Sequence, residues 1–231
     1  MSVAEARELV PAIDSSALSL VDLRVSPGSE LTIGAPDSDS LLYTTAGSGS
    51  LTVDGDMHRL DAGAAALVLA GEEARLRSED SELAVICAAI GPAADRHAPL
   101  GHREVVTRLD ATGSEKASGA RSFQILFGPH NASTRATLFA GFIPPGRAPW
   151  HYHLYDEIVW VPAGPGRLHT GETTDELGAG SAFRLRPRQV HIVENLSGTD
   201  EMTIIGIFTP AGSPSAAYLT PEIAAEYSFS G

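Results

Sequence analysis

Short runs of alternating apolar and polar residues fill the chain, and glycine or proline separates one run from the next. The 231 residues include 23 glycines and 15 prolines, spread at short intervals. Alternation over a few residues is typical of half-buried β-strands. Asp54-Gly55 stands between two such runs in residues 48–60, which predicts a hairpin with a tight turn. Residues 143–161 are aromatic and β-branched, and they predict two strands that meet at residues 154–156. We therefore predict an all-β protein.

Short helices are expected only at the two ends. Ser2 and Glu5 are spaced as in a capping box and precede an apolar run, which predicts a short N-terminal helix. Thr220-Pro221-Glu222 resembles a helix start, since proline favours the first helical position. Helix is otherwise a minor component of the expected fold.

The two halves of the sequence resemble each other at an offset of 117 residues, which is the signature of an internal repeat. Residues 201–206 also match residues 82–87 at an offset of 119, so two residues were gained between the matched segments. The glycines and the leucine that match are Gly164 with Gly47, Gly180 with Gly63, Gly166 with Gly49 and Leu168 with Leu51. The pattern predicts a tandem duplication, with domains at residues 1–92 and 104–231 and a linker at residues 93–103.

Three histidines and one glutamate in the second half predict a transition-metal site. His151 and His153 project to the same side of an extended strand because side chains alternate between faces. Glu157 keeps this parity, and His191 must come from another strand. Imidazole and carboxylate donors suit divalent iron, manganese, nickel, cobalt, copper or zinc, and they discriminate weakly among these metals. No cysteine lies near the motif, which argues against a cysteine-rich structural zinc site.

The motif around these ligands resembles that of the cupin superfamily of small β-barrels. The first cupin motif is matched by Gly146, His151, His153, Glu157 and Gly164. The second is matched by Gly180, His191 and Asn195, whereas Arg186 and Arg188 stand where proline and glycine are usual. The resemblance covers residues 141–210. It implies two tandem double-stranded β-helix barrels of jelly-roll type, with a metal ion at the centre of the second barrel bound by His151, His153, Glu157 and His191.

The first half has lost the ligands. At the repeat offset their positions hold Gly34, Pro36, Ser40 and Ala74, and none of these side chains binds a metal strongly. We expect a degenerate, metal-free barrel that serves as a packing partner for its twin. The alternative, an emptied barrel that binds an organic effector, has no support in the sequence.

Several reactions are open to a metal in such a site. The resemblance favours a mononuclear non-haem dioxygenase of the iron or manganese type acting on a small oxygen-rich substrate, with Glu157 as a ligand. The competing possibility is an isomerase, decarboxylase or lyase acting on a small acid or sugar, in which Glu157 leaves the ion and carries a proton. A third is a regulatory cupin that binds a small molecule without turnover.

Three further residues are candidates for substrate contact. Tyr155 shares the ligand parity and is expected to place its phenol at the barrel mouth. Phe183, which replaces Ala66 of the first half, is expected to line the pocket. Arg186 would fork onto a substrate carboxylate if its strand face looks inward, and would be a solvated charge otherwise. His169 is expected to be a surface or turn histidine.

Charge and composition bound the partners. The net charge is −13, and residues 1–115 carry 19 acidic and 8 basic side chains. Such a surface repels phosphate backbones and anionic lipid heads, so neither nucleic acid nor membrane partners are expected. No apolar stretch is long enough to span a bilayer and no secretory signal is visible. With one cysteine, a cytoplasmic location is expected. The resemblance further implies a homodimer.

Overall fold

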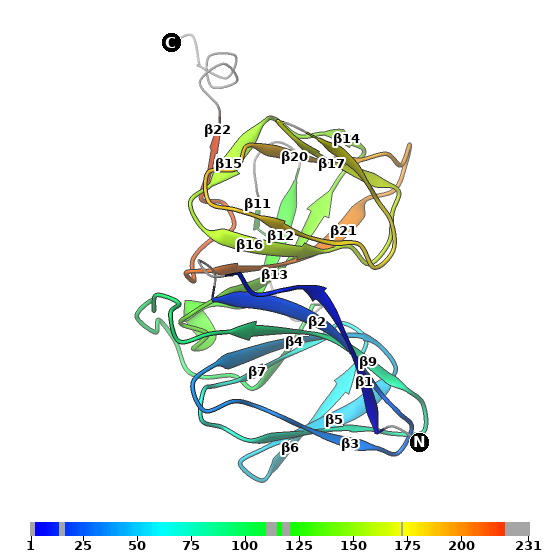
Figure 1. Cartoon of the computed structure of the whole chain (residues 1–231), viewed down its shortest axis with the longest axis vertical. Helices are drawn as coiled ribbons and strands as arrows, with labels where there is room; N and C mark the ends of the chain where they lie inside the picture. The colour runs from blue at the N-terminus through cyan, green and yellow to red at the C-terminus, as the bar shows by residue number, and fades with distance from the viewer. Residues whose placement is uncertain (1–2, 14–16, 110–114, 117–120, 172, 220–231) are drawn as a thin grey trace.

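Two β-barrels stacked along the long axis of the molecule make up the structure (Figure 1), a computed structural model that describes residues 3–13, 17–109, 115–116, 121–171 and 173–219. Each barrel consists of two facing antiparallel sheets. Apart from one 3₁₀ turn at Pro129–Asn131, every regular element in these ranges is a strand. No helix in the described part is long and apolar enough to cross a membrane. The predicted all-β tandem barrel fold is confirmed.

The first barrel faces a six-stranded sheet, ordered β1-β2-β9-β4-β7-β10, with a four-stranded sheet, ordered β3-β8-β5-β6. Its strands are β1 (Ala4–Val10), β2 (Leu18–Val25), β3 (Glu30–Ile33), β4 (Asp39–Ala46), β5 (Ser48–Val53), β6 (Asp56–Asp61), β7 (Ala64–Val68), β8 (Ala74–Ser78), β9 (Leu83–Ile90) and β10 (Val106–Arg108).

The second barrel repeats this arrangement, since its order β12-β13-β21-β16-β19 matches β1-β2-β9-β4-β7. Its other sheet runs β18-β17-β20-β15-β22, with β14 also paired to β20. The strands are β11 (Glu115–Lys116), β12 (Ser122–Phe127), β13 (Thr137–Ile143), β14 (Gly146–Arg147), β15 (His151–His153), β16 (Asp156–Trp160), β17 (Gly166–Thr170), β18 (Thr174–Leu177), β19 (Ala182–Leu185), β20 (His191–Asn195), β21 (Met202–Thr209) and β22 (Ala217–Leu219).

Alternation sets which side chains enter each barrel. In β5 every second residue is buried, and Leu51 and Val53 pack inside. The turn after β5 has positive φ at Asp54 (52°) and Gly55 (90°), the conformation that a two-residue hairpin requires. Val53 then pairs with Asp56, as the predicted hairpin demands. The interior of the first barrel is filled by aliphatic side chains such as Leu42, Leu60 and Leu76.

The largest apolar core lies between the barrels. The outer face of the β2-β9-β4-β7 sheet contributes Leu20, Leu41 and Ile86, and the facing sheet of the second barrel contributes Ile158 and Ile207. All five are at most 2% exposed. Because both sheets bury their outer as well as their inner faces, their strands read as nearly continuous apolar runs. The two barrels therefore share one hydrophobic core where their sheets meet.

The predicted N-terminal helix is wrong. Residues Ala4–Val10 form β1, which pairs antiparallel with β2 from Ala4 opposite Val25 to Val10 opposite Leu20. The segment contains good helix formers, but the open edge of β2 offers a full ladder of hydrogen bonds, and tertiary contacts override local propensity. The helix start predicted at Thr220 lies outside the described residues.

The chain between the barrels bonds first to the second barrel, through His97 and Leu100, and then returns to the first barrel. β10, which follows the expected linker, pairs with β7 from Val106 opposite Ala66 to Arg108 opposite Ala64. A strand from the expected second domain thus completes a sheet of the first barrel. The two halves are joined by a strand as well as by their packed faces.

Candidate metal centre

Three imidazoles meet inside the second barrel. β15 supplies His151 and His153 from alternate positions, and β20 places His191 directly opposite His151 in the ladder. One potential ligand nitrogen from each ring lies within 4.8 Å of those of the other two. The rings are 2–6% exposed. Within the described ranges, no other histidine, cysteine or acidic side chains form such a group.

Hydrogen bonds to the backbone orient two of the three rings and leave one nitrogen of each ring without a hydrogen bond. Nδ1 of His151 donates to the carbonyl of Pro149, and Nδ1 of His191 donates to the carbonyl of Gln189, each at 2.9 Å. Each bond fixes the tautomer and leaves the other nitrogen with a lone pair. Burial lowers the pKa of His151 to about 4, of His191 to about 3 and of His153 to about 2. Arg121 adds to the effect on all three rings and the neighbouring imidazoles add to it for His153 and His191, whereas the hydrogen bonds to backbone carbonyls oppose it for His151 and His191. All three are therefore neutral near pH 7.

Glu157 lies beside the histidines. β16 directs it inward, with its carboxylate Oε2 3.2 Å from Nδ1 of His153. That nitrogen is buried and makes no hydrogen bond. Burial, reinforced by Asp156, raises the pKa of Glu157 to about 8, although Arg121 opposes the shift. Three neutral imidazoles, a buried carboxyl group and an orphaned ring nitrogen fit a divalent first-row metal ion, whose charge would stabilise the carboxylate.

A partly open cavity of about 120 Å³ adjoins the imidazoles and Glu157. Tyr155 lines it, and its ring stacks on His153 and Phe208 at centroid distances of 4.5 and 4.0 Å. Its hydroxyl donates to the carbonyl of Pro214 at 3.4 Å, and burial raises its pKa. Pro214 belongs to the segment that leads into β22, and Leu219 of β22 is also part of the cavity wall.

Two predicted substrate contacts lie elsewhere. Phe183 packs at the edge of the apolar cluster inside the barrel, and the neighbouring inward position of β19, Leu185, takes the place on the cavity wall opposite Glu157. Arg186 is exposed beyond the end of β19, in a shallow surface groove with Arg188. Neither residue lines the cavity. Phe183 packs on the apolar cluster instead, and Arg186 lies beyond the end of β19 at Leu185.

Arg121 is the functional candidate that the sequence pattern did not reveal. It directly precedes β12 and lines the cavity together with the three histidines and Glu157. Burial lowers its pKa to about 10, and Glu157 opposes that shift. No motif marks Arg121, since it lies 30 residues before His151 and outside any alternating run. Only the pairing of β12 with β13 brings it to the site.

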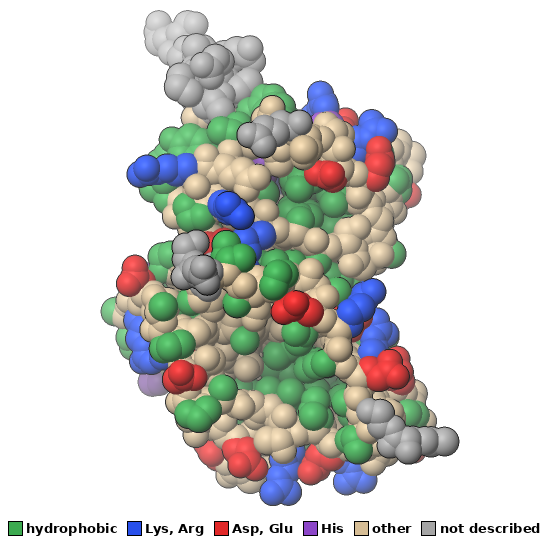
Figure 2. All heavy atoms as spheres, viewed as in Figure 1, with side chains coloured by type: hydrophobic (Ala, Val, Ile, Leu, Met, Phe, Trp, Pro, Cys, Tyr) green, Lys and Arg blue, Asp and Glu red, His purple; other side chains and the backbone are tan. Residues whose placement is uncertain are grey.

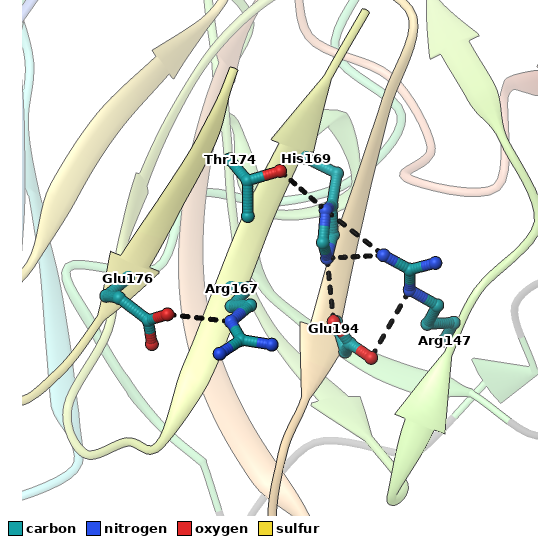
Figure 3. A network of polar contacts seen from close by, with 6 residues as sticks. All are labelled: Arg147, Arg167, His169, Thr174, Glu176 and Glu194. Atoms are coloured by element: carbon teal, nitrogen blue, oxygen red, sulfur yellow. Dashed lines mark hydrogen bonds and ion pairs between the residues drawn. The ribbon is translucent and has the colours of Figure 1, made fainter.

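His169 is not the surface histidine that was expected. Its side chain is 8% exposed and lies in a polar network on the outer face of the β17-β20 sheet (Figure 3). Its Nε2 is 2.7 Å from Glu194, its Nδ1 is 3.1 Å from Thr174, and Arg147 covers the ring. The hydrogen bond from His169 lowers the pKa of Glu194. This network faces away from the cavity and stabilises the sheet whose strands β15 and β20 carry the three histidines.

Comparisons with known proteins agree with this architecture. A family model described as a cupin domain matches residues 140–208. Oxalate decarboxylase from Lactobacillus farciminis, solved as a formate complex, is 12% identical, with a TM-score of 0.78 and coverage of 98% of this chain and 86% of that one. A mutant of Bacillus subtilis oxalate decarboxylase is 14% identical, with a TM-score of 0.76 and coverage of 99% and 81%.

A Pseudomonas aeruginosa protein described as glyoxylate-induced is 13% identical, with a TM-score of 0.77 and coverage of 90% of this chain and 80% of that one. No curated protein sequence matches the chain. At these identities the structural similarity concerns the fold. The cupin-domain match over residues 140–208 agrees with the resemblance that the histidine motif indicated for this part of the chain.

Proposed function

We propose that the protein is a metal-dependent cupin enzyme that acts on a small organic substrate in the second barrel. The observation that carries the proposal is the convergence of three neutral, buried imidazoles at the wall of one cavity. In this proposal His151, His153, His191 and Glu157 hold one divalent transition metal. The ion supplies Lewis acidity, and one-electron chemistry as well if it is iron or manganese.

The surrounding residues contribute positioning and exclusion of water. Tyr155, Phe208 and Phe139 form an aromatic wall next to the ligands, and the apolar lining keeps the local dielectric low. Nδ1 of His151 and of His191 is anchored to backbone carbonyls, so these rings cannot swing away from the ion. The first barrel contributes packing alone, because its interior is filled and its ligand positions are Gly34, Pro36, Ser40 and Ala74.

Two reaction classes are compatible with the site. A dioxygenase remains our first proposal, since neutral imidazoles with a carboxylate suit iron or manganese. A decarboxylase is the second, and it is favoured by the similarity of the whole chain to two oxalate decarboxylases. Dioxygen consumption and carbon dioxide release, measured side by side on a panel of small acids, separate the classes. Carbon dioxide release without dioxygen loss supports the second, and no turnover of any acid indicates a regulatory cupin.

Metal content tests the site itself. Wild-type protein should purify with about one equivalent of a first-row metal, and His191→Ala should lose most of it because one of four ligands is gone. Elemental analysis after identical purification provides the measurement. His102→Ala, which removes an exposed histidine far from the motif, is the matched control and should keep wild-type content. Equal metal content in His191→Ala and the wild type would refute the proposed site.

A further inference from the structure

Arg121 presents an unpaired positive charge to the cavity. Its Nη2 atom is buried and has no hydrogen-bond partner, and Arg121 forms no ion pair with any described residue. Glu157 is the acid that acts on it electrostatically, yet the two groups are not joined by a hydrogen bond. Nη2 is therefore a donor without a partner on a side chain that lines the cavity next to the histidines.

A buried guanidinium nitrogen without a partner is costly, since it has lost its hydrogen bonds to water and gained none in return. The burial does not neutralise it, because a pKa of about 10 leaves the group charged near pH 7. An anion in the cavity would restore the lost hydrogen bonds. Carboxylate is the best match, because its two oxygens accept the two parallel donors of the guanidinium fork.

The rest of the cavity wall determines the size and polarity of the ligand beyond its carboxylate. Away from Arg121 and the ligand cluster, the cavity is bordered by apolar side chains, namely Phe123, Phe139, Ile143, Val193, Ile204 and Leu219. Its volume of about 120 Å³ admits only a small molecule. A compact acid with one carboxylate and a short apolar body would meet the charged end and the apolar end of the cavity at the same time.

We propose that Arg121 is the substrate-anchoring residue and that the enzyme acts on small monocarboxylates whose acid group binds the Arg121 guanidinium beside the metal ligands. This inference rests on the proposed function, because it assigns the substrate class of the same cavity. It adds a specificity residue that neither histidine motif contains.

Butyrate and its neutral isostere butyramide test the anchor. Isothermal titration calorimetry of the metal-loaded wild type should show at least tenfold tighter binding of butyrate. Arg121→Gln should lose that preference, with metal content and butyramide binding unchanged. Arg186→Gln is the matched control, since it removes an exposed arginine outside the cavity and should bind butyrate as the wild type does.

The result that overturns the proposal is wild-type butyrate affinity in Arg121→Gln, or no preference for butyrate in the wild type. If Arg121→Gln does not fold, Arg121→Lys decides, because it keeps the charge and loses the fork. A drop of about tenfold in butyrate affinity supports the anchor, and wild-type affinity refutes it.

The two proposals can fail separately. Protein that purifies without metal but still binds butyrate in an Arg121-dependent manner would refute the proposed metal chemistry and support the anchor. Metal-loaded protein that binds butyrate and butyramide equally would do the reverse.

Discussion

Asp39 and Arg135 form an ion pair across the contact between the barrels, with each side chain 6% exposed and 3.5 Å between Oδ1 and Nη1. Asp39 also accepts a hydrogen bond from the amide of Ala70, and Arg135 donates to the carbonyl of Asp37. Removing one member of such a pair leaves the other charge buried without compensation. The pair therefore matters more for stability than any ion pair on the surface.

Asp39→Ala should lower the free energy of unfolding by about 3 kcal/mol. Chemical denaturation measures the loss. Arg59→Ala is the matched control, since Arg59 lies 3.7 Å from Asp61 with its side chain 69% exposed, and such surface pairs contribute roughly 0–1 kcal/mol. If the two variants lost the same stability, the barrel contact would not depend on the pair.

Single residues were predictable from sequence where spacing alone fixes direction. His151 and His153 share a face because a strand alternates, and the structure places both rings in the cavity. Arg121 and Arg186 show the limit of that argument. Both lie just outside a strand, where parity no longer applies, and only the paths of β12 and β19 turn one arginine inward and the other outward.

At the scale of elements, β21 makes room for the carboxyl group that β16 carries. A Cβ on Gly206 would lie 2.2 Å from the ring of Phe139 and 2.9 Å from Oε1 of Glu157. In the first barrel, the positions equivalent to Glu157 and Gly206 hold Ser40 and Cys87, whose side chains contact each other. Ser40 is smaller than glutamate and leaves space for the thiol, so each barrel combines a large side chain at one of the two positions with a small residue at the other.

Gly206→Ala should displace Phe139 or Glu157, cost about 1–3 kcal/mol of stability and weaken metal binding about tenfold or more. Metal titration and thermal unfolding give the two readouts. Gly198→Ala serves as the control, because Gly198 is exposed and no atom would lie within 4 Å of its Cβ. Unchanged metal affinity in Gly206→Ala would show that the carboxylate does not need the space.

The strands themselves were largely predictable, because glycine and proline punctuate the alternating runs and the repeat projects one half onto the other. The ends were not. The first residues favour a helix by local propensity, yet they pair with β2, whose partner requirement is not visible in a local sequence. β10 is a similar case, since its place in the first barrel depends on the free edge of β7.

For the whole molecule, the shared apolar core predicts that the barrels unfold together. Two probes report on them separately. Trp150 and Trp160 belong to the second barrel, whereas Cys87 lies buried in β9 of the first. Burial raises the pKa of the Cys87 thiol to about 12, so a thiol reagent should react with it only after the barrel opens.

Tryptophan fluorescence and Cys87 labelling should therefore give coincident midpoints along a denaturant series. Ile158→Ala, which truncates a fully buried side chain between the barrels, should shift both midpoints by the equivalent of about 2–4 kcal/mol. Separate midpoints would show that the barrels are independent units in solution.

Charge is distributed unequally between the two halves of the chain. The net charge of −13 comes mostly from the half whose barrel interior is filled, while charged side chains of both signs are interspersed on the face seen in Figure 2. A mixed surface of this kind favours solubility over the binding of polyanions.

In the described part of the chain β22 pairs with β15, and the residues before and within β22 line the cavity. The first strand, β1, belongs to the other barrel (Figure 1). A fluorescent protein or affinity handle joined directly after Leu219 would adjoin the cavity wall, whereas one joined directly before β1 would lie on the other barrel. Reporter fusions intended to leave the chemistry undisturbed therefore belong at the N-terminal side.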